Sequence, residues 1–158
     1  MQNKDILEQV YNWLKAGAPH EESHGMGFDM QYILIDVEDE EVPGGITREW
    51  NDYTECGTVG CIAGAIVQFH RGGPFNGRYP IAGDAARIMG FHPDSADYDR
   101  AMELFYPEAF DGHFDNQLSW IYGEGKNYYD STPEQVARVL RKYIDTDGKV
   151  VDWSLAED

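Results

Sequence analysis

The chain has 158 residues, of which 42% are apolar and 13% aromatic, and it carries 29 Asp and Glu against 12 Lys and Arg. This composition predicts a single globular domain spanning residues 1–158, and the two cysteines are too few for a disulfide scaffold. The net charge of −17 disfavours direct binding to nucleic acid or anionic membranes, and the lack of a long apolar run or a secretion signal predicts a cytoplasmic protein.

A first helix is predicted to follow Asn3, a residue type that commonly serves as an N-cap. The apolar residues that recur at the spacing of one helix face are Ile6, Leu7, Val10, Tyr11 and Leu14. Gly17 and Pro19 predict where this helix ends. The β-branched and aromatic stretch 28–37 then predicts a strand, and residues 43–45 a turn in a loop or hairpin.

A central helix is predicted from residue 59 towards His70, with Thr58 as its N-cap. Residues 59–67, VGCIAGAIV, are apolar or small on every side, which indicates a helix covered all round. Gly60 and Gly64 are four positions apart, and we interpret these small residues as allowing another element to pack closely.

Residues 81–90 predict a short helix that Gly90 stops. Asp94 or Ser95 can cap the next helix, which Pro107 ends. The residues expected on its inward face are Tyr98, Ala101, Met102 and Phe105. Between residues 108 and 130 the sequence is rich in aromatic residues and glycine and has no clear period.

The last helix has the clearest signals, because Thr132 is its N-cap, Pro133 its first residue and Gln135 completes a capping box. Its apolar stripe is Val136, Val139, Leu140, Tyr143 and Ile144, and Gly148 closes it. A short extended segment should then pack Val150 and Trp153 against the body. The predicted fold is mostly α (with α+β possible), a compact single-domain helical fold with a minor strand or hairpin component.

The two cysteines, Cys56 and Cys61, raise the question of catalysis. Cys61 falls in the first turn of the predicted central helix, where the helix dipole favours a thiolate. A catalytic thiol needs a histidine base, and nothing in the sequence selects one of the five histidines: His20, His24, His70, His92 and His113. Free cysteine is also a small, frequently buried residue. We therefore predict that Cys61 is a core residue, and we assign no catalytic residue.

Two pairs of potential ligands could form a zinc site: His20 with His24, and Cys56 with Cys61. Pro19 and the glycines near residue 26 place the histidines in a loop, so their spacing loses its geometric meaning. A segment beginning at Asp145, DTDGKVVD, resembles the start of a calcium loop but lacks the third ligand position and the closing Glu. We predict no metal and no cofactor.

One resemblance rests on four segments in this order: FDM at 28–30, CGTVGCIAG at 56–64, TPEQVARVL at 132–140 and GKVVDW at 148–153. Together they resemble a group of small uncharacterised bacterial and phage proteins in which a C-G-T-x-x-C-x-A-G segment is the hallmark. The resemblance spans most of the chain, and only the hallmark is specific. It implies a shared fold and no particular reaction.

The sequence favours an acidic protein-interaction module over an enzyme, in the manner of a phage-type inhibitor that covers a basic, nucleic-acid-binding surface of a partner protein. The residues expected to make the contact are an acidic cluster, Glu38, Asp39, Glu40 and Glu41, and four aromatics, Trp120, Tyr122, Tyr128 and Tyr129. The alternative is a cysteine- and histidine-dependent enzyme or a small-ligand-binding protein. The sequence leaves homo-oligomerisation open.

Overall fold

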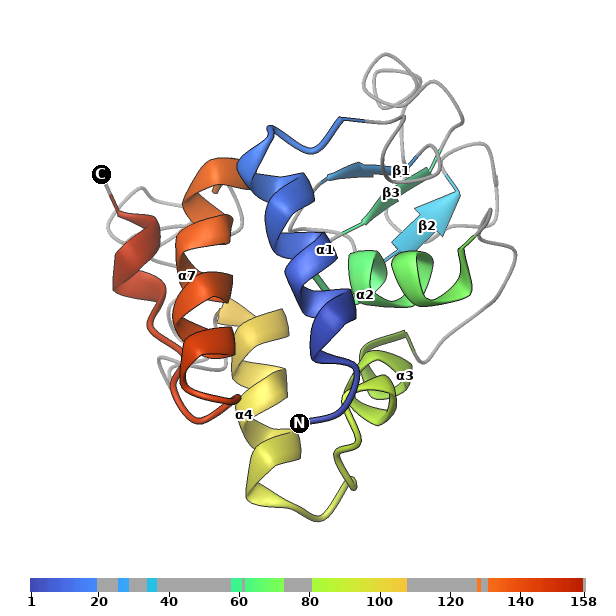
Figure 1. The fold of residues 1–158 in the computed structure, drawn as a ribbon, viewed down its shortest axis with the longest axis vertical. Coiled ribbons are helices and arrows are strands. Elements are labelled where there is room, and N and C mark those ends of the chain that lie inside the picture. The colour runs from blue at the N-terminus through green and yellow to red at the C-terminus, as the bar shows by residue number, and fades with distance from the viewer. Residues whose placement is uncertain are drawn as a thin grey trace, which may run out of the picture.

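The computed structural model describes residues 1–19, 26–28, 34–36, 58–60, 62–72, 81–107, 128 and 131–157 (Figure 1). Within these ranges the chain forms five α-helices, three short strands and one 3-10 helix. The predicted helical fold with a minor strand component is therefore confirmed. No helix in the described ranges has both the length and the apolar character needed to cross a membrane.

Helices α1 (Lys4–Lys15) and α7 (Pro133–Asp145) lie side by side and bury their apolar faces against each other and the rest of the core (Figure 1). The predicted face of α1 is correct for Leu7, Val10 and Leu14, which are fully buried. Trp13 is also buried, although the sequence pattern did not place it on this face. Its indole N–H donates to the carbonyl of Pro19 at 2.8 Å, which satisfies its one polar atom.

The prediction that Asn3 caps α1 is wrong. Asn3 has a left-handed backbone (φ 54°) and makes no side-chain cap hydrogen bond. Its side-chain amide instead donates to the carbonyl of Ile88 at 2.6 Å, at the end of helix α3 (Ile81–Ile88). Asparagine tolerates the left-handed region better than most residues, so it can start α1 and bind the end of α3 together.

Three strands form a small sheet in the order β1-β3-β2: β1 (Met26–Phe28), β2 (Leu34–Asp36) and β3 (Thr58–Gly60). β1 runs parallel to β3, and β2 runs antiparallel to it. The predicted strand over residues 28–37 is therefore wrong as one continuous element, because its two ends belong to strands on opposite sides of β3. The predicted turn at residues 43–45 lies outside the described residues.

Helix α2 (Ile62–Arg71) begins three residues later than predicted, because Thr58 lies in the central strand and is not an N-cap. β-Branched Thr58 and Val59 suit a strand, and pairing with β1 and β2 on both sides satisfies the backbone of β3. Residues 62–68 of α2 are all buried, which confirms that this helix is covered all round. Cys61, between β3 and α2, lies outside the described residues.

Helix α3 and helix α4 (Ala96–Phe105) follow the prediction closely. Ser95 caps α4, its hydroxyl accepting from the amide of Tyr98 at 3.1 Å. Ala101 and Phe105 are buried as expected, while Tyr98 and Met102 are half-buried. Leu104 is also fully buried and was not predicted on the inward face.

Helix α7 has the predicted start: Thr132 and Gln135 form a reciprocal capping box, with Pro133 in the first turn. At its end the amide of Gly148 donates to Tyr143 at 2.8 Å and that of Asp147 to Ile144 at 3.0 Å, the pattern of a Schellman motif. Both Asp147 (φ 53°) and Gly148 (φ 78°) have positive φ, so the turn does not rest on the glycine alone.

Residues 149–152 of the predicted extended segment 149–153 form no helix, and the 3-10 helix η3 (Trp153–Ala156) begins at the last residue of that segment. Trp153 is fully buried, as predicted. The prediction for Val150 is wrong, because its side chain is 38% exposed and Val151 is buried in its place.

Candidate functional site

Of the eight residues predicted to make the interaction surface, Tyr128 alone is described. The residues that lie outside the described ranges are Glu38, Asp39, Glu40, Glu41, Trp120, Tyr122 and Tyr129. Tyr128 is half-buried, and its hydroxyl donates to Oε1 of Glu157 at 2.6 Å. Its ring lies 5.7 Å from the ring of Trp153, at an interplanar angle of 34°. These contacts fix Tyr128 against η3, and its role in an interaction stays a prediction.

Trp153 also holds the end of α4. Its indole N–H donates to the backbone carbonyl of Glu103 at 3.0 Å. In a continuing helix that carbonyl would accept from the amide of residue 107, but Pro107 has no N–H. The indole therefore supplies the donor that the proline removes. We call Tyr128, Trp153, Glu157 and the Glu103 carbonyl the Trp153 cluster.

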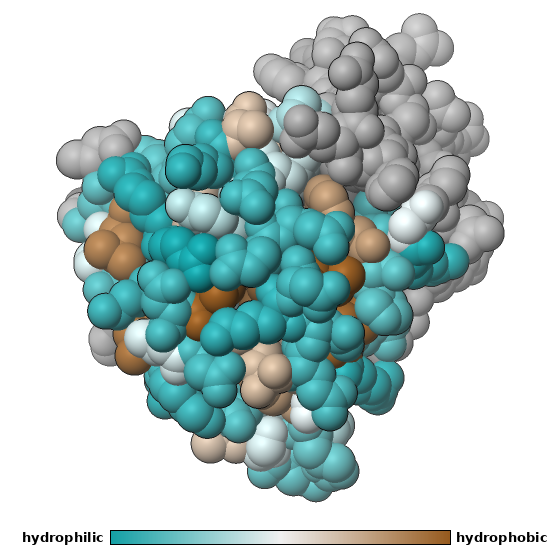
Figure 2. Space-filling model, viewed as in Figure 1, coloured by the Kyte–Doolittle hydropathy of each residue, from teal (hydrophilic) through white to brown (hydrophobic). Residues whose placement is uncertain are grey.

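Charge is divided unevenly between the described helices and the remaining sequence. We define the helical body as residues 1–19, 62–72, 81–107 and 131–157, which hold nine Lys and Arg and twelve Asp and Glu. Residues 20–61 contain eleven Asp and Glu and a single Arg. The helical body is therefore almost neutral. The face of the helical body that Figure 2 shows is mostly hydrophilic, with small, separate apolar areas.

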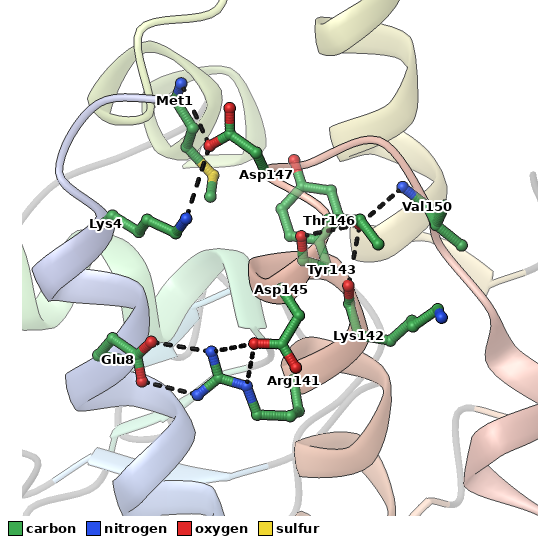
Figure 3. Close-up of polar contacts among 10 residues, drawn as sticks. All are labelled: Met1, Lys4, Glu8, Arg141, Lys142, Tyr143, Asp145, Thr146, Asp147 and Val150. Atoms are coloured by element: carbon green, nitrogen blue, oxygen red, sulfur yellow. Dashed lines mark hydrogen bonds and ion pairs between the residues drawn. The ribbon is translucent and has the colours of Figure 1, made fainter.

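Ion pairs neutralise several basic side chains of the helical body. The largest group joins α1 to α7, where Arg141 donates to both carboxylate oxygens of Glu8 at 2.8 and 2.9 Å and to Asp145 at 2.9 Å (Figure 3). The guanidinium also lies 4.9 Å from the ring centroid of Tyr11. The hydrogen bond from Arg141 lowers the pKa of Glu8, and the same bond raises the pKa of Arg141. Arg141 is thus engaged within the fold.

The end of α7 holds the acids of the segment that resembles a calcium loop. Asp145 pairs with Arg141, whereas Asp147 lies 3.8 Å from the amine of Lys4 and 3.7 Å from the amine of Met1 (Figure 3). Asp152 instead caps η3, accepting from the amide of Ser154. The three carboxylates have different partners and do not converge on one point. Within the described residues, no group of three or more metal-ligand side chains is gathered.

The described histidines offer little support for cysteine chemistry. His70 and His92 are exposed, and Nδ1 of His92 accepts from the amide of Asp94 at 3.3 Å. His70 lies near the far end of α2, about 12 Å along the axis from its first residue, at 1.5 Å per residue. Both cysteines and the other three histidines lie outside the described residues, so the predicted burial of Cys61 stays a prediction.

The buried hydroxyl of Tyr143 on α7 has no hydrogen-bond partner among the described residues. The side chain is fully buried, and a Cβ at Gly148 would lie 3.3 Å from this hydroxyl. Burial, followed by the negative charge of Asp97, raises the pKa of Tyr143. The hydroxyl therefore stays neutral at ordinary pH.

Comparison with known protein families, curated proteins and solved structures gives no match. The resemblance to small bacterial and phage proteins therefore stays an expectation from the sequence.

Sequence reasoning missed the Trp153 cluster and the Glu8–Arg141 pair. The partners in each are far apart in sequence, so no local spacing links them. One local signal was present for the first: Pro107 at the end of α4 leaves the carbonyl of Glu103 without its helical donor.

Proposed function

We propose that this chain is an acidic protein-interaction module that binds a basic surface of a partner protein. The partner class is a nucleic-acid-binding protein whose basic face the module covers, in the manner of a phage-type inhibitor. The proposal includes a cytoplasmic location and no catalytic step.

The observation that carries the proposal is the uneven distribution of charge. The helical body is nearly balanced and several of its basic groups are paired internally, so it adds little to the net charge of −17. The excess comes largely from residues 20–61, which hold eleven of the 29 acidic residues and one of the twelve Lys and Arg. A concentrated negative field attracts a basic partner and accelerates encounter.

The aromatic residues between 108 and 130 complement this charge. Charge sets the rate of encounter and the choice of partner, whereas buried aromatic side chains supply much of the affinity of protein interfaces. The proposal therefore predicts binding whose association is salt-sensitive, because exposed charges are screened beyond about 10 Å at 0.1 M salt.

The test is capture of host proteins on the immobilised chain at low salt, followed by kinetic measurements with the purified captured protein. The acidic-cluster variant carries Gln at Glu38, Glu40 and Glu41 and Asn at Asp39. We expect it to slow association more than it speeds dissociation, because steering acts on encounter. A captured protein without a basic surface, or association that is insensitive to salt, would contradict the proposal.

A matched control removes the same number of charges from the helical body. It places Asn or Gln at four exposed acids, Asp5, Asp94, Asp99 and Glu134. Because both variants lose four negative charges, a general effect of net charge would slow association equally in both. We expect the acidic-cluster variant to be several-fold slower than this control. Equal rates would show that the cluster at 38–41 is only a solvated segment.

A further inference from the structure

The Trp153 cluster brings together two points of the chain that lie on either side of residues 104–127. On one side, the indole N–H binds the carbonyl of Glu103 at 3.0 Å. On the other, the indole ring contacts Tyr128, whose hydroxyl binds Glu157 at 2.6 Å. One fully buried side chain thus touches the chain before and after this stretch.

We propose that the Trp153 cluster is a positioning device for the partner interaction, with Tyr128, Trp153 and Glu157 as positioning residues. This inference rests on the proposed function, because the other aromatic residues expected to contact the partner, Trp120, Tyr122 and Tyr129, are near Tyr128 in the sequence. The cluster fixes the chain at Glu103 and at Tyr128, and binding draws on this fixed arrangement. Fixing contact groups before binding reduces the entropy that association costs.

The hydrogen bonds of the Trp153 cluster explain why a tryptophan and a tyrosine suit these positions. The Glu103 carbonyl lacks a helical donor because of Pro107. The indole N–H supplies the hydrogen bond that this carbonyl would otherwise lack. The Tyr128 hydroxyl donates to a carboxylate, and such charge-assisted bonds are stronger than neutral ones. Both hydrogen bonds are made by this short segment: Trp153 is the first residue of η3, and Glu157 is the residue that follows it.

The first test is hydrogen exchange of the whole chain followed by mass spectrometry, which needs no partner. Tyr128→Phe keeps the ring and removes the donor. The amide of Ser131, which donates to the carbonyl of Tyr128 at 3.2 Å, reports on this point. We expect exchange in the peptide 128–132 to rise about tenfold, the equivalent of one lost hydrogen bond to a charged group. Exchange in α1 should stay unchanged.

Two further variants separate positioning from general stability. Glu157→Gln keeps an oxygen acceptor for Tyr128 and should raise exchange less than Tyr128→Phe does. Tyr98→Phe is the matched control: the same chemical change at a half-buried tyrosine of α4, with no hydrogen bond to its hydroxyl among the described residues. It should leave peptide 128–132 unaffected. A Tyr128→Phe effect that is absent, or that is equal in α1, overturns the cluster as a local device.

The second test uses the basic protein captured with the parent chain. We expect Tyr128→Phe to weaken binding several-fold while the salt dependence stays the same, because no charge is removed. A clear exchange effect with unchanged affinity overturns the role of the cluster in binding. Failure to capture any basic protein, with the exchange effect intact, overturns the proposed function instead and with it the positioning role.

Discussion

Helix α2 is buried on every side from Ile62 to Gln68, whereas α7 buries one face and leaves Glu134, Arg138 and Lys142 exposed. α7 begins with its own capping box and ends in a Schellman turn made by its own carbonyls. α2 begins two positions after the last residue of β3 and has no acidic residue in its first turn. The two helices therefore depend on different sources of stability.

The difference shows which interactions place each helix along the sequence. The start of α7 follows from local side-chain to backbone hydrogen bonds between residues three positions apart. The start of α2 follows from the sheet before it and from the elements packed around it. Changes in α2 should act through packing, and changes at the start of α7 through capping.

The largest expected effect is in α2. Ile66→Ala removes a fully buried side chain from the stretch of α2, residues 62–68, in which every residue is buried. We expect the free energy of unfolding to fall by about 2–5 kcal/mol, the cost of lost burial plus a cavity. Urea denaturation checks this against Lys142→Ala on the exposed face of α7, which should change stability by less than about 0.5 kcal/mol. Similar losses in the two variants would break the comparison.

A smaller loss is expected at the start of α7. Thr132→Ala removes the hydroxyl that accepts from the amide of Gln135 at 3.3 Å. The expected cost is about 1 kcal/mol, and Thr132→Ser should restore most of it, because serine caps as well as threonine. Thermal and urea unfolding measure both variants. A serine variant as unstable as the alanine variant would show that packing of the threonine methyl, and not capping, matters here.

Tyr143→Phe tests whether the hydroxyl of Tyr143 contributes to the stability of the fold. Its hydroxyl is buried without a partner among the described residues, so removing it should leave stability unchanged or raise it by up to about 1 kcal/mol. The raised pKa of Tyr143 adds a second readout. In the parent, the folded state keeps the proton of this hydroxyl to higher pH than the unfolded state does. The free energy of unfolding therefore falls as pH rises above the unfolded pKa of 10.0 towards the folded pKa. The variant should unfold less readily than the parent above pH 10, and a destabilised variant would reveal a partner for the hydroxyl.

The smallest effect is expected from the ion pair between α1 and α7. Glu8 is 42% exposed, so Glu8→Gln should cost less than about 1 kcal/mol. Because the folded pKa of Glu8 lies below 4.5, the pair stabilises the fold above that pH and is lost as pH falls through the folded value. A double-mutant cycle with Arg141→Lys, repeated at neutral and acid pH, measures this coupling. Coupling that persists once Glu8 is protonated would point to packing around Tyr11.

Elements defined by local signals could be predicted from the sequence. α7 was predicted with its cap, and α4 with Ser95 as one of two cap candidates, because these hydrogen bonds join residues three positions apart. The strands could not be predicted in this way. Thr58 suits both an N-cap and a strand, and the choice was made by pairing with β1 and β2, which are distant in sequence. Asn3 failed for the same reason, since its partner is the carbonyl of Ile88.

The candidate site was less predictable than the fold. The sequence displays the concentration of acids near residue 40 directly, because charge needs no folding to be counted. The anchoring of Tyr128 could not be foreseen, since its partners Trp153 and Glu157 join it only through the path of the chain. Aromatic residues without a period indicate neither burial nor exposure.

The packing of α1 on α7 has a consequence for synthesis. Arg141 binds Glu8 across 133 positions, so the ribosome completes α1 long before its partner helix exists. At about 5–20 residues per second, α1 waits on the order of ten seconds. During that time its side chains Leu7, Val10, Trp13 and Leu14 lack part of the core that covers them in the finished fold. We expect the nascent chain to be recognised by chaperones until α7 has emerged from the ribosome.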